Sequence, residues 1–232
     1  MAKTLSPCQD RLGVIVMRVI AGKLRSRQLK SSKGLELRPT SDRLRETLFD
    51  ILGNLVVGSR FIDGFAGTGA VGIEALSRGA AEVTFIEKSG KAADLIRRNL
   101  ESLGVKTGTR VLPMDVLHGL RILEEELSAR RQPVQPASPD VEGEPRTEAA
   151  QIILFLDPPY DKAAEYDRVL MFAGSANLLE QGDLVIAEHR RNFRLPEAVE
   201  SLERVRVASQ GDGALSFYRM AKKTPIHHAG TE

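Results

Sequence analysis

A glycine-rich loop at residues 63–72 is the first segment of this sequence that could do chemistry. It reads Asp63-Gly64-Phe65-Ala66-Gly67-Thr68-Gly69-Ala70-Val71-Gly72 and lies between a short apolar run and a predicted helix. Glycines let the backbone turn sharply and approach a ligand, and a helix N-terminus offers free N–H groups. Glu87 follows Gly67 by twenty residues. This spacing predicts a site for an adenosine-containing cofactor, with Glu87 accepting from the ribose hydroxyls. The candidate cofactor contacts within the loop are Asp63, Gly64, Ala66, Gly67 and Gly69.

Two further carboxyl groups bear on which cofactor this loop binds, a nicotinamide dinucleotide or S-adenosylmethionine. Asp63 precedes the glycines, where a carboxylate repels a pyrophosphate but pairs with the amino group of a methionine moiety. Asp115 ends the third apolar run and can accept from the adenine amino group. Each could instead cap a helix or end a strand in solvent. Glu87, Asp63 and Asp115 all fall where parallel strands end and ligands bind. Together they favour S-adenosylmethionine as the cofactor, and its chemistry requires no metal ion.

Asp157-Pro158-Pro159-Tyr160 follows the fourth apolar run and is the candidate catalytic motif. The exocyclic amino group of a base is a poor nucleophile because its lone pair is delocalised into the ring. Asp157 and the carbonyl of Pro158 can accept its two N–H bonds, and prolines hold φ at about −65°, so both acceptors are preorganised. Tyr160 can stack on the base. The motif predicts methyl transfer to an amino group, with Asp157 taking the released proton. The alternative is a proline turn with a surface tyrosine.

The elements that must position these residues alternate between strands and helices. Apolar runs that end in an acidic residue cover 61–63, 83–87, 111–115, 152–157 and 184–188, and helical stretches cover 70–78, 91–103, 118–127 and 163–179. This alternation predicts a parallel sheet covered on both faces. The last strands, 205–208 and 214–220, leave no room for a helix between them and must be antiparallel. We therefore predict an α/β fold, a mostly parallel seven-stranded Rossmann-like sheet with an antiparallel last strand.

The charge distribution sets the N-terminal part of the chain apart. Residues 1–60 hold 12 Lys and Arg against 5 Asp and Glu, although the net charge of the whole chain is only +2. A basic segment beside a mildly acidic body is typical of proteins that bind a polyanion, and a solvated amphipathic surface is the alternative.

The same patterns divide the chain into parts. We expect an N-terminal extension at 1–16, a basic arm with a hairpin and a helix at 17–58, a catalytic domain at 59–221 and a tail at 222–232. Residues 128–151 hold four prolines without periodicity and are predicted to be a surface insertion.

Composition excludes several classes of protein. With 42% apolar and 28% charged residues, the chain is not disordered as a whole. Its apolar runs are far shorter than the ~20 residues of a membrane helix, and residues 1–10 lack the apolar core of a signal peptide. Cys8 is the single cysteine, which excludes an internal disulfide and fits a reducing cytoplasm.

Five segments together resemble the bacterial 16S ribosomal RNA guanine-N2 methyltransferases of the RsmD type. They are MRVIAGKLRSRQLK (17–30), RPTSDRLRETLFDIL (38–52), FIDGFAGTGAVGIEALSRGA (61–80), FLDPPYD (155–161) and ALSFYR (214–219). The resemblance implies a class I methyltransferase fold, S-adenosylmethionine as cofactor, and transfer to the N2 amino group of one guanine in 16S rRNA. By the same resemblance the partner is that rRNA or an assembly intermediate of the small subunit. We also expect the protein to be a cytoplasmic monomer.

The resemblance also gives the basic arm a purpose. The candidate contacts to RNA phosphates are Lys23, Arg25, Arg38, Arg43 and Arg45. Arginine suits forked phosphate binding. The alternative is that Arg43 and Arg45 pair with Glu46 and Asp50 on their own helix.

Some features depart from the family pattern or leave alternatives open. Gln210-Gly211 stands where the family has Tyr-Gly, and Met17 is a candidate initiator. The motif chemistry suits an adenine-N6 or cytosine-N4 DNA methyltransferase equally well, and the glycine loop alone suits a dehydrogenase. A further alternative, which is not an enzyme, is a non-catalytic RNA-binding assembly factor. His189 could line the acceptor pocket, although a structural imidazole is the better interpretation.

Overall fold

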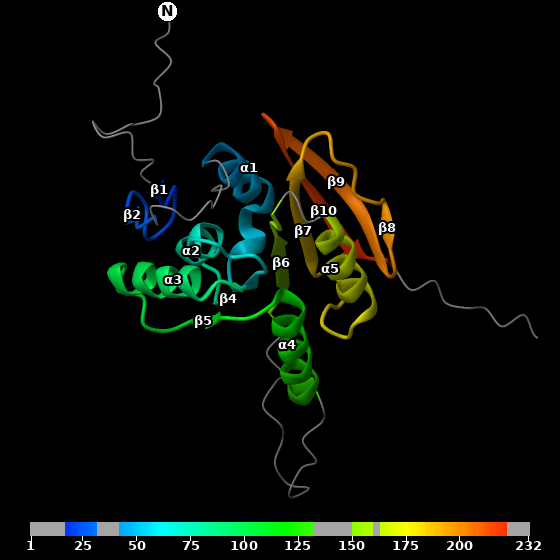
Figure 1. The fold of residues 1–232 in the computed structure, drawn as a ribbon, viewed down its shortest axis with the longest axis horizontal. Coiled ribbons are helices and arrows are strands. Elements are labelled where there is room, and N and C mark those ends of the chain that lie inside the picture. Colours follow the sequence, from blue (N-terminus) through cyan, green and yellow to red (C-terminus); the bar gives the residue numbers. More distant parts are fainter. Residues whose placement is uncertain (1–16, 32–41, 132–149, 160–162, 222–232) are drawn as a thin grey trace, which may run out of the picture.

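The chain, as a computed structural model, is described for residues 17–31, 42–131, 150–159 and 163–221 (Figure 1). The strands are β1 (Met17–Arg18), β2 (Gln28–Leu29), β3 (Arg60–Asp63), β4 (Glu82–Ile86), β5 (Thr109–Leu112), β6 (Ile152–Leu156), β7 (Leu184–Arg190), β8 (Ala198–Val199), β9 (Leu202–Gln210) and β10 (Gly213–Met220). The helices are α1 (Asp42–Leu52), α2 (Ala70–Ser77), α3 (Gly90–Ser102), α4 (Val116–Arg131) and α5 (Ala163–Ser175), with a 3-10 turn at Gly53–Val56.

The central sheet has the order β5-β4-β3-β6-β7-β10-β9-β8. The five strands from β5 to β7 are parallel, and β10 pairs antiparallel with both β7 and β9. The predicted mixed sheet is confirmed, but the strand number was wrong. The sheet has eight strands, because the two-residue strand β8 pairs with β9 at the edge.

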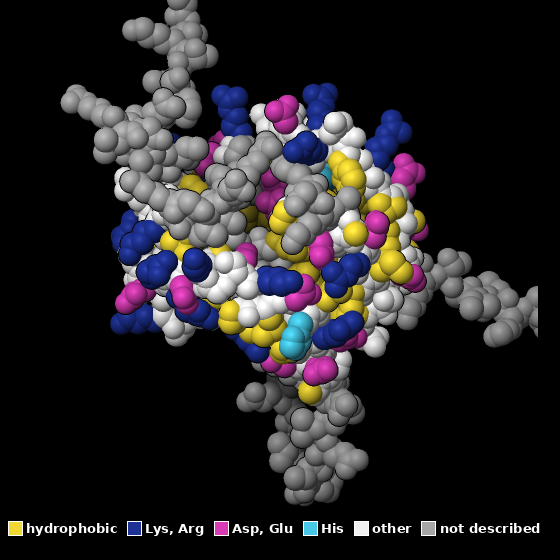
Figure 2. All heavy atoms as spheres, viewed as in Figure 1, with side chains coloured by type: hydrophobic (Ala, Val, Ile, Leu, Met, Phe, Trp, Pro, Cys, Tyr) yellow, Lys and Arg dark blue, Asp and Glu magenta, His cyan; other side chains and the backbone are white. Residues whose placement is uncertain are grey.

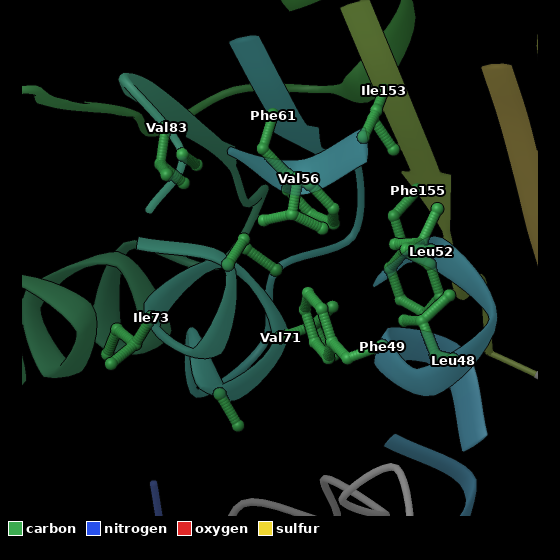
Figure 3. Close-up of a cluster of buried hydrophobic side chains, with 14 of the residues drawn as sticks. Leu48, Phe49, Leu52, Val56, Phe61, Val71, Ile73, Val83, Ile153 and Phe155 are labelled. Atoms are coloured by element: carbon green, nitrogen blue, oxygen red, sulfur yellow. The ribbon is translucent and has the colours of Figure 1, made fainter. Parts of the chain in front are cut away.

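Helices cover both faces of the sheet, and each face has its own apolar core. On one face, Leu48, Phe49 and Leu52 of α1 pack with α2, β3 and β6, and the rings of Phe49 and Phe61 lie 6.1 Å apart (Figure 3). On the other face, α4 and α5 pack against β6 and β7. Both cores are close-packed hydrocarbon, so the carboxyl ends of the strands are held at fixed positions relative to one another.

The hairpin β1–β2 is fastened to α2 and α3 by buried polar side chains. Glu74 is fully buried and accepts from the backbone N–H groups of Ile20 (2.7 Å) and Ala21 (2.9 Å). Asn99 is also fully buried; its side chain accepts from Lys30 N at 2.8 Å and donates to Lys30 O at 3.2 Å. These bonds complete the hydrogen bonding of a hairpin too short to be stable alone.

Several predicted boundaries differ from the structure: α5 ends at Ser175 rather than at residue 179, and β9 spans Leu202–Gln210 rather than 205–208. Helix α4 continues through residues 128–131, which we expected to begin the insertion, because Leu127 extends the apolar side of the helix. Residues 132–149 of that segment lie outside the described part, as do the predicted extension and tail, whereas Gln151 accepts a hydrogen bond from Arg60 N. In the described part, no helix combines the length and apolar character needed to span a bilayer.

Candidate functional site

Acidic residues follow one another along the carboxyl edge of the parallel strands. In the order of the strands across the sheet they are Asp115, Glu87, Asp63, Asp157 and Glu188. Asp63 pairs in register with Phe155 of β6, and Phe155 pairs with Ile186 of β7. The structure therefore brings together the cofactor loop and the proline motif, which are ninety residues apart in sequence.

Asp63 is the most deeply buried of the three predicted acidic cofactor residues, at 2% exposure. Its Oδ2 accepts a 2.9 Å hydrogen bond from Gly72 N in the first turn of α2. Burial raises the pKa of Asp63 to about 7, and the nearby carboxylates of Glu87 and Glu188 also raise it, whereas the Gly72 hydrogen bond lowers it. This carboxyl group is therefore poised to ionise when a cation binds beside it.

Glu87 holds the glycine loop in place. Its Oε2 accepts from Gly67 N (2.8 Å), and its Oε1 accepts from Ser89 N (2.7 Å). A carboxylate oxygen has two acceptor positions, so these bonds leave capacity for the ribose hydroxyls that we expect here. Gly67 and Gly69 adopt φ of +52° and +79°, which only glycine tolerates easily, and Gly69 thereby turns the chain into α2.

The other loop residues lie tightly against the sheet. Gly64 N donates to Phe155 O (2.8 Å), and a Cβ at Gly64 would come within 2.9 Å of Leu156. Ala66 N donates to Ile86 O (3.1 Å), and Ala66 is buried. These bonds join the loop to β6 and β4 on either side of β3.

Asp115 caps helix α4. Its Oδ1 accepts from Leu117 N at 3.1 Å, and its carbonyl accepts from Gly119 N at 3.0 Å. The capping role that we considered as the alternative is therefore present. It occupies one carboxylate oxygen, and the adenine contact predicted for Asp115 remains a prediction for the other.

The proline motif directly extends β6. Pro158 is buried, Asp157 is partly buried and Pro159 is exposed. Strand β6 is buried over its whole length, and Asp157, which follows its last residue, is the first residue along this part of the chain that is not fully buried. Tyr160 lies outside the described residues.

His189 has the structural role that we favoured. Its Nδ1 lies 2.9 Å from Arg190 O and its Nε2 lies 2.8 Å from Ser216 Oγ. Burial lowers the pKa of His189, so the neutral ring can bridge β7 to β10. Both ring nitrogens are committed to this bridge.

The arm residues divide into exposed and buried groups. Lys23, Arg25 and Arg43 are exposed. Arg25 and Arg43 line one cavity of about 480 Å³ between the hairpin and α1. Its other charged lining residues are Arg18, Arg78, Asp42, Glu46 and Asp50. Figure 2 shows Lys and Arg side chains gathered on the side of the molecule where β1, β2 and α3 lie. A second cavity, of about 300 Å³, opens at the opposite edge of the sheet beside α4 and includes none of the predicted site residues. Arg38 lies outside the described residues.

Arg45 does not lie where an RNA contact requires it. Its side chain is 1% exposed, and its Nη2 donates to Arg18 O (2.8 Å) and to Asp42 Oδ1 (2.9 Å). Arg45 falls on the buried side of α1, between Leu44 and Leu48. Its partner is Asp42 rather than the Glu46 or Asp50 that we considered, and we do not propose Arg45 as an RNA contact.

Sequence reasoning missed four residues that shape the site. Glu74, Ser77 and Asn99 fasten the hairpin, and Asn99 also donates to Thr68 O in the glycine loop at 3.2 Å. Their signal was polarity at buried helix positions. Glu188 ended a predicted strand like the other acidic residues, but we gave it no role.

The described residues fit S-adenosylmethionine. Asp63 and Asp115 each use one carboxylate oxygen for a backbone N–H, and the second oxygen of each has no hydrogen bond to another described residue. The close contacts at Gly64 leave no room for a Cβ at that position, and the positive φ of Gly67 disfavours any other residue there, so the backbone is without a side chain at both positions. No group of three or more potential metal ligands occurs in the described residues.

The fold and the acidic carboxyl edge define the class: this is a class I methyltransferase that depends on S-adenosylmethionine. A putative methyltransferase of Escherichia coli superposes with a TM-score of 0.67 at 26% sequence identity, over 90% of this chain and 99% of that one.

Comparison of the sequence then places the chain in one family. The family model described as "Conserved hypothetical protein 95" matches residues 17–130 and 124–219, so the chain belongs to this family, which is the RsmD family. "Putative rRNA methyltransferase YlbH" of Bacillus subtilis is 31% identical over 203 residues, which cover 88% of this chain and 98% of the relative. "Ribosomal RNA small subunit methyltransferase D" of Escherichia coli K12 is 32% identical over 197 residues, which cover 84% and 86%. The predicted family is confirmed.

Proposed function

We propose that this protein methylates the N2 amino group of a guanine in the RNA of the small ribosomal subunit. The observation that carries the proposal is the position of Asp157-Pro158-Pro159 at the sheet edge, one strand from the cofactor loop. The relatives named as rRNA or small-subunit rRNA methyltransferases support an RNA substrate.

The residues of the chain would divide the work as follows. Asp63, Glu87 and Asp115 hold the amino acid, ribose and adenine parts of the cofactor. When bound, S-adenosylmethionine supplies an electrophilic methyl group whose bond to sulfur breaks with the electron pair remaining on sulfur.

Asp157 and the carbonyl of Pro158 accept the two N–H bonds of the guanine amino group, so that the nitrogen lone pair is directed at the methyl carbon. The nitrogen becomes strongly acidic as it forms the new bond, so an ordinary carboxylate is basic enough to take its proton. We assign that step to Asp157, with Tyr160 stacked on the base.

The arm would hold the RNA backbone while the target base leaves its stack, which costs a few kcal/mol. Arg25 of the hairpin and Arg43 of α1 line one cavity, and Lys23 is exposed on the hairpin that carries Arg25. Together with Arg38, these are our proposed phosphate contacts. We expect the enzyme to act as a monomer in the cytoplasm, on rRNA or on a small-subunit assembly intermediate.

The direct test is to incubate the protein and labelled cofactor with small subunits from cells that lack the corresponding methyltransferase, and then to map the labelled nucleotide. The proposal expects one labelled guanine carrying N2-methylguanine. Label on adenine or cytosine, or labelling of DNA instead, would support an amino methyltransferase with another substrate. No transfer to any of these, with RNA binding intact, would support a non-catalytic assembly factor.

A further inference from the structure

Glu188 occupies the strand position beside the proposed catalytic residue. The last paired residues of β6 and β7 are Leu156 and Ala187, and Asp157 and Glu188 come next on their strands. Side chains alternate along strands, so Glu188 in β7 projects to the same face as Ile186. Asp157 follows the last residue of β6, and the same alternation continued by one residue would place it on the face of Phe155. Ile186 and Phe155 belong to one core cluster. Neighbouring parallel strands lie about 4.8 Å apart, so these two carboxyl groups share one side of the sheet edge.

The backbone holds Glu188 firmly. Its carbonyl accepts a 2.6 Å hydrogen bond from Tyr166 Oη on α5, and on its other side it pairs with Leu215 of β10. The Glu188 residue is 4% exposed. A side chain on a central strand that is paired on both sides is well suited to position an acceptor for a base.

The carboxyl group of Glu188 has a second acidic neighbour at the same edge of the sheet. Glu188 lies close enough to Asp63 to raise the pKa of that group. Buried carboxylates near one another cost stability because each loses hydration and they repel. Such arrangements are concentrated at functional sites.

The base proposed as substrate offers a partner for this second acceptor. On the Watson–Crick edge of guanine, the N2 amino group adjoins N1–H, which is a second donor. Adenine and cytosine instead present a ring-nitrogen acceptor next to their amino group. A second carboxylate beside Asp157 would therefore attract guanine and repel the other two bases.

We propose that Glu188 accepts the N1–H of the target guanine while Asp157 accepts from its amino group, which makes Glu188 the residue that selects guanine. This inference rests on the proposed function. The proline motif alone suits any exocyclic amino group, so a neighbouring residue must supply the choice of base. His189 is unsuited to selecting the base, because its Nδ1 is hydrogen-bonded to Arg190 O and its Nε2 to Ser216 Oγ.

The test replaces the mapped guanine by 2-aminopurine in reconstituted small subunits. This base keeps the 2-amino group to be methylated but carries an acceptor at N1. For the wild-type protein we expect kcat/KM to be about 100-fold or more lower on 2-aminopurine than on guanine, because a site built for a hydrogen bond rejects a base that cannot make it. In Glu188→Gln the amide N–H can donate to N1, so the ratio of the two values should fall about tenfold or more. Glu203→Gln, an exposed substitution on β9, is the matched control and should leave the ratio unchanged.

The outcomes separate this inference from the proposed function. If wild-type protein labels no guanine in the small subunit, the proposed function fails before any variant is made. If wild-type protein labels guanine but Glu188→Gln leaves the ratio at its wild-type value, Glu188 does not read N1. Should Glu188→Gln fail to fold, Glu188→Asp keeps the charge but shortens the side chain. We then expect about a tenfold loss on guanine with discrimination retained, and unchanged kcat/KM would overturn the inference.

Discussion

The side-chain amide of Asn99 on α3 donates a hydrogen bond to the carbonyl of Thr68, in the middle of the glycine loop. The same side chain makes two hydrogen bonds to Lys30, the residue that follows β2. One buried amide therefore connects the hairpin of the basic arm to the loop that is proposed to bind the cofactor.

Asn99→Ala should weaken both folding and cofactor binding. Buried polar groups that lose their partner cost about 1–3 kcal/mol, so we expect the free energy of unfolding to fall by about that amount. Urea unfolding and calorimetric titration with S-adenosylhomocysteine measure the two effects. Asn54→Ala, at an exposed position, is the control. Unchanged affinity in Asn99→Ala would show that the loop does not need this anchor.

Asp157→Ala should lower the methyl-transfer rate by about 10²-fold or more, because it removes both the amino-group acceptor and the proton acceptor. Affinity for the cofactor should be preserved, since Asp157 lies beyond the loop that holds it. Single-turnover kinetics separates transfer from product release. Asp157→Asn keeps an acceptor oxygen but not the base, and should be intermediate. Equal rates for wild type and Asp157→Ala would remove Asp157 from catalysis.

Cofactor affinity should rise between pH 5.5 and 7.5. The pKa of Asp63 is raised to about 7 in the folded protein, so the carboxyl group is protonated at the lower pH and ionised at the upper one. The α-amino group of the cofactor is still largely protonated there, and it pairs only with the ionised carboxylate. Titration with S-adenosylhomocysteine at several pH values measures this rise. Asp63→Asn should bind more weakly and with a flat pH profile; a wild-type profile in that variant would contradict the assignment.

Asp63 also has a predictable effect on folding. Its pKa is raised above the unfolded value of 3.8, so the folded state binds the extra proton between about pH 4 and 7. Its contribution to stability is therefore greatest below pH 4 and is lost as the pH rises through 7. Asp63→Asn should remove this loss and be relatively more stable than wild type at pH 8 than at pH 5, as measured by urea unfolding. An equal difference at both pH values would show that Asp63 does not titrate between them.

Arg43→Ala should weaken RNA binding and reduce its dependence on salt. Each phosphate contact to a single strand contributes about 0.7 to the slope of log K against log salt concentration, so the slope should flatten by about that amount. Arg110→Ala is the matched control, because Arg110 is exposed on β5 and pairs with Glu126 beside the opposite edge of the sheet. If both variants keep the wild-type slope, Arg43 makes no phosphate contact.

In contrast to Arg43, Arg45 should affect the stability of the protein and not its RNA binding. Arg45→Ala removes hydrogen bonds to Arg18 O and Asp42, and we expect the free energy of unfolding to fall by about 1–3 kcal/mol. The salt slope of RNA binding should stay at the wild-type value. Arg45→Met fills more of the same space and should lose less stability. A flatter salt slope in either variant would return Arg45 to the RNA surface.

The order of elements in the sheet could be predicted because buried parallel strands leave a clear pattern of apolar runs between amphipathic helices. The antiparallel end followed from the short Gln210–Gly213 connection. Strand β8 could not be predicted, since two residues carry no periodicity and their strand depends on pairing with β9.

The burial of Arg45 shows what the site prediction lacked. Arg45, Leu48, Phe49 and Leu52 follow the three- and four-residue spacing of one helix face, and all four are buried. A stripe made only of Leu and Ile residues would be Leu44, Leu48, Ile51, Leu52 and Leu55; Leu44, Leu48 and Leu52 are buried, but Leu55 lies beyond the helix and is 39% exposed. Charge alone led Arg45 to be assigned to the surface. The correct face could have been found from Phe49, whereas the acceptor of its buried guanidinium, Arg18 O, depends on the tertiary structure.

The close approach of Gly22 to helix α2 limits how the arm can be studied. Gly22 adopts φ of +80°, and a Cβ there would lie 2.0 Å from Ser77 O, so backbone meets backbone without an intervening side chain. Removing the hairpin would expose to solvent the surface of α2 that the hairpin covers, and would leave Glu74 and Ser77 without the backbone groups to which they are hydrogen-bonded. An enzyme without the hairpin would therefore lose stability as well as RNA affinity. Only single substitutions on the outer surface of the hairpin can separate its contribution to RNA binding from its contribution to folding.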